Sequence, residues 1–442
     1  MNKIFIIIVF SAFAYAGWQQ IIFVPGQADQ MPMEILSKAM IDSARAAVEL
    51  AIGLVGVMAL FLGLMKVAEA GGMLSILAKL ISPLMVRLFP DVPRDHPAMG
   101  AMILNLAANA LGLGNAATPF GIRAMQELDR LNPVKGEATN AMALFMAINT
   151  SSVTLLPTGV IALRAAAGSI DPAAILPTTL FATIGSTSVA IIACKLYQHF
   201  FSQKISGHIK DNESADKGTS TDDTLKHASN GYPLWISILA LGILASLIPV
   251  AILFGSSVSP WILPSLMVGF LGFGLIKKVQ IYEVFIEGAK EGFQVALRII
   301  PYMVAILVAV GMLKASGALQ IIVNAISSVT TNFGLPAEAL PMALMRPLSG
   351  SGAYAILASI INDPAIGPDS YTGLLVSTLQ GSTETTFYVM AVYFGAVQIK
   401  RIRHALAAAL TADVAGVLFA ILACSLFFFR QLSGVMSGVR LA

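Results

Sequence analysis

Long apolar segments recur along the chain, separated by short polar or glycine-rich stretches. A helix needs about 20 predominantly apolar residues to cross the roughly 30 Å hydrocarbon core of a bilayer. The segments that approach or exceed this length are 4–24, 47–66, 142–163, 175–197, 234–254, 261–276, 295–313, 373–397 and 405–429. This pattern predicts an all-α integral membrane protein with several spans, because helices and closed barrels alone satisfy the backbone inside lipid.

The first apolar segment has a second interpretation. Lys3, the apolar stretch after it, and the small residues Ala12, Ala14 and Ala16 are also typical of a cleaved signal peptide. A retained helix is the favoured interpretation, because apolar residues continue through 21–24, past any such cleavage point.

Segment 198–231 is hydrophilic, with four Lys and five acidic residues among Ser, Thr and Gly. It predicts a hydrated linker, which the lysines favour placing in the cytoplasm. The chain then divides into a first membrane repeat at 1–197, this linker, a linking transmembrane helix at 232–258, and a second membrane repeat at 259–442.

The two repeats carry related motifs in the same order. GLMK at 63–66 recurs as GMLK at 311–314, and each is followed by a glycine-rich polar stretch, 105–121 or 346–354. NTSSVT at 149–154 then parallels QGSTET at 380–385, and the last helices contain IIAC at 191–194 and ILAC at 421–424. Duplication explains this order, so we expect two pseudo-symmetric repeats.

The positive charges predict how the repeats are oriented, because short cytoplasmic loops collect Lys and Arg. The basic clusters lie at 123–135, 195–204, 277–278 and 400–403. All four are cytoplasmic together if the glycine-rich stretches re-enter the membrane instead of crossing it. This arrangement predicts inverted repeats with discontinuous or re-entrant helices. Arg430 and Arg440 conflict with it, and parallel repeats stay open as the alternative.

Composition supports the membrane prediction. Charged residues make up 12% of the chain and hydrophobic residues 57%, whereas a soluble domain has about 25% charged residues. The net charge of +3 arises from 27 basic and 24 acidic residues without a basic patch, which excludes a nucleic-acid partner. Cys194 and Cys424 lie in apolar segments and are predicted to pack as small hydrophobic residues.

Two polar, glycine-rich interruptions lie at matching places in the repeats, 105–118 and 346–352. Broken helices are tolerated in a membrane where they are buried in protein or line a wet cavity, and paired breaks are typical of a transporter's binding site. Tight packing through small residues is the alternative. The candidate substrate-binding residues here are Asn105, Asn109, Asn115, Thr118, Arg346, Ser349 and Ser351.

A second pair of polar runs lies within apolar segments, where unpaired polar groups are costly. Isolated Ser and Thr usually bond back to their own helix, but consecutive ones cannot all do so. Some should therefore face a cavity or unwind the helix. The candidate substrate-binding residues of these runs are Asn149, Thr150, Ser151, Ser152, Gln380, Ser382 and Thr383.

Three charged residues in the second repeat are predicted to lie inside the membrane: Arg346, Glu384 and Asp413. Intramembrane charges usually have partners. We therefore expect Arg346 to neutralise Glu384 or Asp413, with one carboxylate binding a coupling Na⁺ or carrying a proton. A purely structural ion pair is the alternative.

The sequence contains no G-x-x-x-x-G-K-[ST] loop and no H-E-x-x-H motif, and its five His fall at loop positions expected to be on the surface. No nucleophile and base occur at a sensible spacing. We therefore expect no metal, no cofactor beyond the coupling ion, and no enzymatic activity.

These motifs resemble those of known membrane-protein families. The first half, with GLMK at 63–66 and LGLGNAATP at 111–119, resembles spore maturation protein A. The second half, with GAKEGF at 288–293, RPLSGSG at 346–352 and GSTET at 381–385, is similar to spore maturation protein B. Each half would carry the nucleoside recognition, or Gate, domain. The resemblance implies an integral protein of the bacterial inner membrane and, for the spore family, a role in spore core dehydration.

The residues and the resemblance together predict a multi-pass transporter of a small polar solute. Its midplane site would be formed by the paired broken helices, and a gradient would drive it. A non-transporting cell-envelope factor, such as a scaffold or a carrier of lipid-linked wall precursors, is the alternative. Membrane lipid is an expected partner, and small residues at 53–63 favour a homodimer.

Overall fold

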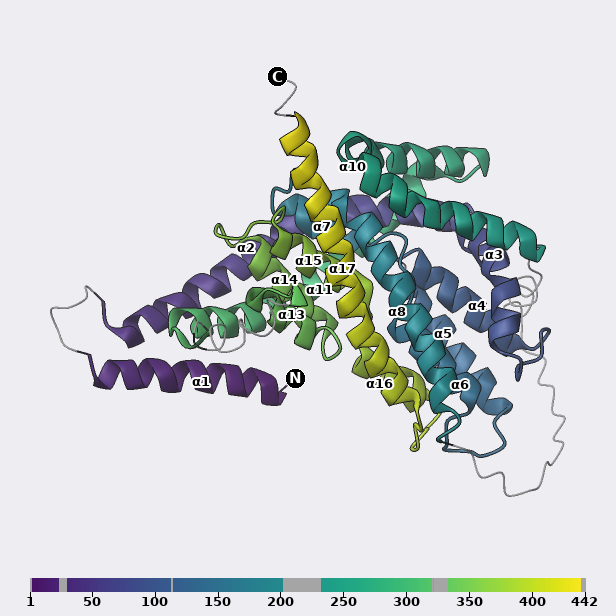
Figure 1. The fold of residues 1–442 in the computed structure, drawn as a ribbon, viewed down its shortest axis with the longest axis horizontal. Coiled ribbons are helices and arrows are strands. Elements are labelled where there is room, and N and C mark those ends of the chain that lie inside the picture. Colours follow the sequence, from purple (N-terminus) through teal and green to yellow (C-terminus); the bar gives the residue numbers. More distant parts are fainter. Residues whose placement is uncertain are drawn as a thin grey trace. The chain divides into compact units, whose positions relative to one another are not determined.

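The computed structural model describes residues 2–23, 30–112, 114–201, 232–319, 321 and 333–438. In these residues the fold is all-α, without β-strands, which confirms the predicted fold class (Figure 1). In chain order, the helices are α1 (Asn2–Ile21), α2 (Pro32–Ala70), α3 (Met73–Leu88), α4 (Pro97–Ala110), α5 (Gly114–Arg130), α6 (Asn140–Thr150), α7 (Thr158–Ala166), η1 (Pro172–Ala174), α8 (Ile175–Tyr197), α10 (Leu234–Ile276), α11 (Ile281–Ala315), η3 (Ala337–Ala339), α13 (Leu340–Met345), α14 (Gly350–Ile361), α15 (Tyr371–Ser382), α16 (Thr386–Ala396) and α17 (Ala405–Gly438).

The helices follow the same order in both repeats. Each repeat has a long helix (α2 or α11), an interrupted pair (α4 and α5, or α13 and α14), a second interrupted pair (α6 and α7, or α15 and α16), and a long last helix (α8 or α17). The related motifs of the two halves therefore correspond to related elements.

Left-handed glycines follow both of the long helices that carry the repeated GLMK and GMLK motifs. Gly72 has φ 87° after α2, and Gly317 has φ 81° after α11. Glycine adopts this conformation without a side-chain penalty, so it ends a helix sharply. After Gly72 the chain turns into α3, and the axes of 55–70 and 73–88 form an angle of 69°.

Two of the apolar segments are each interrupted at their polar run, where unwinding was one of the two expected outcomes. Segment 142–163 is split into α6 and α7 by non-helical residues 151–157, and 373–397 into α15 and α16 by 383–385. Consecutive Ser and Thr offer the backbone alternative hydrogen bonds, and Pro157 cannot donate one. Conversely, segments 234–254 and 261–276 belong to one helix, α10.

The helices group into two compact units. Unit 1 consists of Met1–Leu64, Thr158–Ile175 and Phe285–Gln380, and unit 2 of Met65–Pro157, Leu176–Val284 and Gly381–Ala442. The chain passes from one unit to the other at the interruptions after α6 and within the 380–385 run. Both units therefore contain segments of both repeats.

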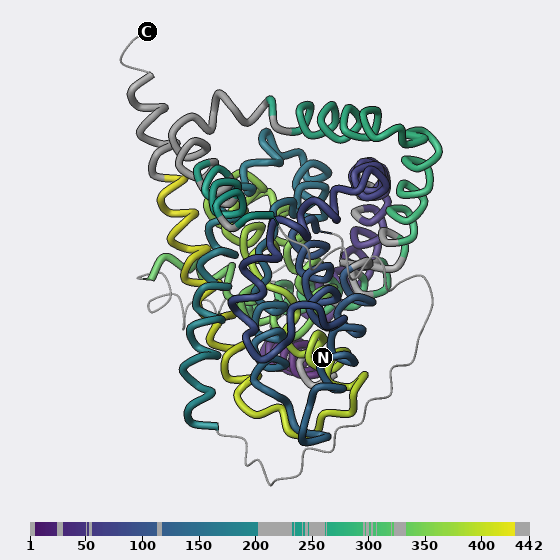
Figure 2. The backbone as a smooth tube through the Cα atoms, turned by 90° about the vertical axis from the view of Figure 1, so that its right-hand side faces the viewer, coloured from purple at the N-terminus to yellow at the C-terminus, as the bar shows by residue number. Residues whose placement is uncertain are grey.

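In unit 2, the last helices of the two repeats, α8 and α17, run side by side (Figures 1 and 2). Phe181 and Phe419 meet edge to face with ring centroids 5.8 Å apart. The Ser186 hydroxyl donates to the Ala412 carbonyl at 2.8 Å. The main core of this unit is formed by buried side chains of α3, α4, α5, α6, α8, α16 and α17.

In unit 1, α2 lies against α11 through glycines that allow close approach. A Cβ on Gly292 would lie 2.6 Å from the Met58 carbonyl oxygen, and one on Gly63 would lie 2.7 Å from the Phe285 ring. A smaller core joins these two helices to α1: Ala12, Ala16, Leu36, Met312, Leu313 and Ala318.

Large apolar side chains remain exposed along the helices, as expected for surfaces that face lipid. Phe10 on α1 is 68% exposed, Val268 on α10 70%, and Val414 on α17 62%. Among the described residues, Pro172–Tyr197 and Ala405–Phe428 are each long and apolar enough to span a membrane, and the bent pair at 55–88 gives a third candidate. The protein is thus a helical membrane protein, while its full number of spans stays a prediction.

Candidate functional site

Three helix interruptions meet in unit 2. The interruption after α4 joins the one after α6, because the Leu155 amide donates to the Ala110 carbonyl at 2.8 Å. The interruption before α16 joins the same place, because the Glu384 amide donates to the Thr150 carbonyl at 2.8 Å. Backbone groups left free by broken helices thus satisfy one another, as a low-dielectric interior requires.

Gly112 permits the contact between the first two interruptions. Its φ is 77°, and a Cβ there would lie 2.5 Å from the Leu156 carbonyl oxygen. Any other residue would meet both the left-handed backbone and this clash.

An asparagine network connects the interrupted helices. Asn105 Nδ2 donates to the Ala117 carbonyl at 2.8 Å and to the Tyr393 hydroxyl at 3.1 Å. Asn109 Nδ2 donates to Asn149 Oδ1 at 2.9 Å, and Asn149 Nδ2 donates to the carbonyl of Phe145 at 2.9 Å. Asn105 and Asn149 are buried, at 0% and 1% exposed. The predicted residues Asn105, Asn109 and Asn149 therefore come together.

Three buried side-chain oxygens in the same unit have no hydrogen-bond partner among the described residues: Asn105 Oδ1, Ser152 Oγ and Thr179 Oγ1. Thr179 lies at the interruptions, because a Cβ on Gly381 would be 3.1 Å from its hydroxyl. Buried polar groups are almost always hydrogen-bonded, so these three atoms are suited to accept or donate to a bound polar molecule.

Other hydroxyls of the first polar run are satisfied locally. Thr150 Oγ1 and Ser151 Oγ both donate to the Ala147 carbonyl of their own helix, at 3.0 and 2.8 Å. The alternative of back-bonding within the helix thus holds for these two residues, whereas Ser152 lies in the non-helical segment.

Of the predicted coupling residues, Asp413 lies on α17 and is 5% exposed. Its Oδ2 accepts a hydrogen bond from Thr386 Oγ1, at the start of α16, at 2.7 Å. Glu384 is half-buried in the interruption before α16. Both carboxylates belong to unit 2, and an ion pair of either with Arg346 stays a prediction.

Unit 1 contains the corresponding interruption of the second repeat. Arg346 follows α13 and is 6% exposed, and its Nε donates to the Gln380 carbonyl at 3.1 Å. Ser349 caps α14 by accepting from the Gly352 amide at 3.1 Å. Gln380 is buried, and its Oε1 has no hydrogen-bond partner in the described part of the chain.

The remaining predicted residues vary in burial. Ser382 and Thr383 are buried and belong to unit 2. Thr118, in unit 2, and Ser351, in unit 1, are half-buried. The side chain of Asn115 lies outside the described part of the structure.

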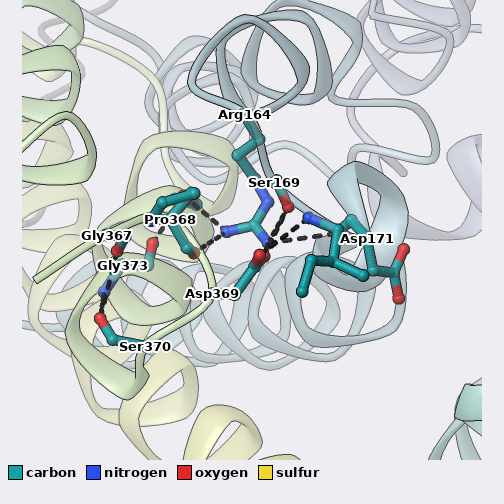
Figure 3. A network of polar contacts seen from close by, with 10 residues as sticks. Arg164, Ser169, Asp171, Gly367, Pro368, Asp369, Ser370 and Gly373 are labelled. Atoms are coloured by element: carbon teal, nitrogen blue, oxygen red, sulfur yellow. Dashed lines mark hydrogen bonds and ion pairs between the residues drawn. The ribbon is translucent and has the colours of Figure 1, made fainter.

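A buried arginine of the first repeat, Arg164 at the end of α7, was not predicted; it is 1% exposed. Figure 3 shows its guanidinium pointing toward Ser169, Pro368 and Asp369. Its Nη2 bonds Ser169 Oγ at 3.1 Å and forms an ion pair with Asp369 Oδ1 at 3.0 Å. Its Nη1 donates to the Pro368 carbonyl. Arg164 thus adds a buried charge in the first repeat to the three predicted in the second. The signal available was a charge directly after an apolar run.

At another position in unit 2, three of the predicted cytoplasmic clusters meet. The Ala138 amide donates to the Arg401 carbonyl at 2.9 Å, and Arg403 Nη1 donates to the Ala138 carbonyl at 3.0 Å. Arg403 also donates to the Phe201 carbonyl. A cavity of about 610 Å³ opens beside them, lined by Gln126, Asp129, Lys135, Gly136, Ala396, Val397, Gln398 and Lys400.

His404 was expected on the surface, and this is wrong, because the residue is 0% exposed. Burial, and then the charge of Arg403, lower the pKa of His404 to about 4. The imidazole is therefore neutral at neutral pH.

Comparisons with known proteins agree with the fold and the motifs. The chain is 46% identical to spore maturation protein B of Bacillus subtilis over 166 residues, 38% of this chain and 92% of that protein. It is 43% identical to spore maturation protein A of the same organism over 167 residues, 38% of this chain and 85% of that protein. Inner membrane protein YjiG of Escherichia coli is 31% identical over 97 residues, 22% of this chain and 63% of that protein. No solved structure matches. The nucleoside recognition (Gate) family model matches residues 51–167 and 296–400, and the chain belongs to this family.

Proposed function

We propose that the protein transports a small polar solute across the bacterial inner membrane, and that the interruptions in unit 2 form part of its binding site. The observation that carries this proposal is the set of buried atoms without hydrogen-bond partners in the described residues, Asn105 Oδ1, Ser152 Oγ and Thr179 Oγ1. They accompany three broken helices in a strongly apolar protein.

The chemistry of these atoms defines the solute class. An amide oxygen and two hydroxyls offer acceptors and donors without charge, which suits a neutral solute rich in hydroxyl or amide groups. The family's description as nucleoside recognition fits this class. The E. coli relative is named an inner membrane protein, which supports the same location.

Inverted repeats are the second part of the proposal. Contacts within each unit support them, provided that α6–α7 and α15–α16 each cross the membrane once. In unit 2 the loop before α6 pairs with the loop after α16, through Ala138 and Arg401. In unit 1 the residues after α7 bond the loop before α15, through Ile170 and Asp369. The two interrupted helices then run in opposite directions, as inverted repeats require.

Coupling to a cation gradient is the third part of the proposal. Glu384 lies in an interruption, with its amide bonded to the Thr150 carbonyl. Asp413 is buried in the same unit and accepts a hydrogen bond from Thr386, two residues after Glu384. Acidic residues inside a membrane are costly to keep charged, and where they occur they mark ion pathways and proton relays. We propose that Glu384 is the coupling residue. Asp413 then holds the start of α16, next to Glu384, through its hydrogen bond from Thr386.

A thermal-shift screen of the detergent-purified protein tests the binding step. The panel contains nucleosides, nucleobases and amino acids, each with and without Na⁺. A ligand at about a hundredfold excess over its Kd should stabilise the folded state by about 2.7 kcal/mol. The shift should be lost in Asn105→Ala and Ser152→Ala. It should persist in the controls Asn362→Ala and Ser188→Ala, whose side chains bond their own helices.

Uptake by proteoliposomes tests transport itself. Accumulation of the solute found in the screen should require a Na⁺ or proton gradient and should fail in Glu384→Gln, while binding of that solute persists. Absence of both binding and uptake across the panel would favour a non-transporting envelope factor instead.

A further inference from the structure

Helices α7 and α16 occupy the same place in the two repeats. Each is short, follows an interruption after α6 or α15, and precedes the last long helix of its half. Here a half means a sequence repeat, 1–197 or 259–442, and a unit means a folded body. Each of the two helices belongs to a different unit from the helix that precedes it. The chain passes between the units at 157/158 before α7 and at 380/381 before α16.

In unit 2, α16 of the second half packs on helices of the first half. The Tyr393 ring stacks on Phe145 of α6, with centroids 6.2 Å apart. The Tyr393 hydroxyl accepts from Asn105 of α4 at 3.1 Å. Gly121 of α5 lies directly beneath the same ring and leaves no space for a Cβ.

In unit 1, α7 of the first half packs on helices of the second half. A Cβ on Gly159 of α7 would lie 2.5 Å from the Tyr354 hydroxyl on α14. Arg164 Nη1 donates to Ser377 of α15 at 3.4 Å, and its Nη2 pairs with Asp369 (Figure 3). A glycine–tyrosine contact thus joins α7 to α14 and α5 to α16, which are equivalent helix pairs.

The loops repeat this reciprocity. In unit 2, Arg403 of the second half forms an ion pair with Glu137 of the first half and donates to the Ala138 carbonyl. Arg401 forms a backbone bridge with the same Glu137. In unit 1, Arg164 of the first half forms an ion pair with Asp369 of the second half. In both cases an arginine of the segment after the interruption binds the loop before the other half's interrupted helix.

We propose that each half completes a folded unit of the other by donating the short helix after its interruption, so that the two halves form an obligate pair. The receiving surfaces are the faces of α5 and α6 for α16, and the faces of α14 and α15 for α7. The occupant of each surface is the other half of this chain. This pairing of the halves holds whether or not the protein transports a solute.

Cleavage of the full-length protein tests this pairing. A protease site placed within 204–230 cuts the folded protein between its halves. The two fragments should remain together in mild detergent and separate only at the temperature where they unfold, because separation requires withdrawal of both helices. Fragments that separate below that temperature while each keeps its own cooperative unfolding transition would overturn the proposal.

Size compensation tests the helix contact directly. Gly159→Ala should lower the melting temperature of the cleaved protein, and Tyr354→Phe on the other fragment should restore most of it by removing the clashing hydroxyl. Gly56→Ala, with open space around the position, is the control on the same fragment. A Gly159→Ala loss that is unchanged by Tyr354→Phe would contradict the contact between halves.

A disulfide tests the reciprocal loop contact. Glu137 and Arg401 face each other in a backbone bridge, which brings Cα atoms within the range that a disulfide needs. With Cys194 and Cys424 replaced by Ala, oxidised Glu137→Cys/Arg401→Cys protein should run as one band after cleavage and as two after reduction. Either single Cys variant should give two bands throughout.

Discussion

Buried ionisable side chains have the strongest measurable consequences at the scale of single residues. Arg164 and His404 are both almost completely buried, but one is charged and paired while the other is held neutral. Neither side chain was predicted to be buried, because each follows or precedes an apolar run and the sequence contains no sign of what packs over it.

His404 should make the protein sensitive to mild acid. Its pKa falls from 6.5 to about 4, mainly because burial disfavours the charged form. The unfolded chain therefore binds a proton before the folded one, and stability is lost as the pH falls from 6.5 towards 4. The loss should reach about 2 kcal/mol at pH 5. His404→Gln should therefore lose less stability than the wild-type protein between pH 7 and pH 5, as measured by the melting temperature at each pH. An equal fall in melting temperature for the two proteins would contradict this prediction.

The Arg164–Asp369 pair should respond unequally to removal of its two members. Arg164 is buried, whereas the Asp369 side chain is 36% exposed and also bonds the Ile170 amide. Asp369→Asn leaves a buried guanidinium without its counter-charge, which typically costs about 3–5 kcal/mol. Arg164→Met leaves a carboxylate that water reaches, so its cost should be smaller. Thermal unfolding of both variants gives the order, and the reverse order would mean that packing of the arginine stem dominates.

At the scale of elements, the helix interruptions give Gly112 a specific role. Gly112→Ala combines a left-handed backbone with a clash against the Leu156 carbonyl. Gly136→Ala is the matched control, because φ is 81° there but nothing lies within 4 Å of its Cβ. The control should cost about 1–2 kcal/mol for the backbone alone, and Gly112→Ala clearly more. Equal losses of thermal stability would show that the two interrupted segments can move apart.

At this scale, the sequence predicted the helix interruptions but not the side chains from distant segments that pack against them. Gly, Pro and runs of Ser and Thr correctly indicated where helices are interrupted, because these residues act on their own backbone. Tyr393 and Thr386, which bond predicted residues, were missed, and so was Thr179, whose hydroxyl lies at the interruptions. They come from distant segments, and a tyrosine in an apolar helix looks like any core residue until a buried Asn is found opposite it.

At the scale of the whole molecule, the proposed inverted repeats make a labelling prediction. Lys135→Cys and Lys400→Cys line one cavity, so both should react with an impermeant thiol reagent from the cytoplasmic side. Ser169→Cys, in the segment after α7, should react from the opposite side. The native Cys194 and Cys424 are buried and give a low background. Labelling of all three positions from the same side would contradict the inverted arrangement.

The donation of α16 by the second half also means that the first half is synthesised well before the helix that covers it. The first half reaches Thr150 roughly 236 residues before synthesis arrives at Thr386, where α16 begins. At about 5–20 residues per second, this interval lasts roughly 12–50 s. During it, Asn105 and Phe145 have no α16 to cover them, in a membrane that cannot satisfy polar groups. During this interval, insertion factors or membrane proteases can bind the exposed first half. Mutations that weaken the packing of α16 should therefore lower the amount of protein in the membrane more than they lower the activity of each folded molecule.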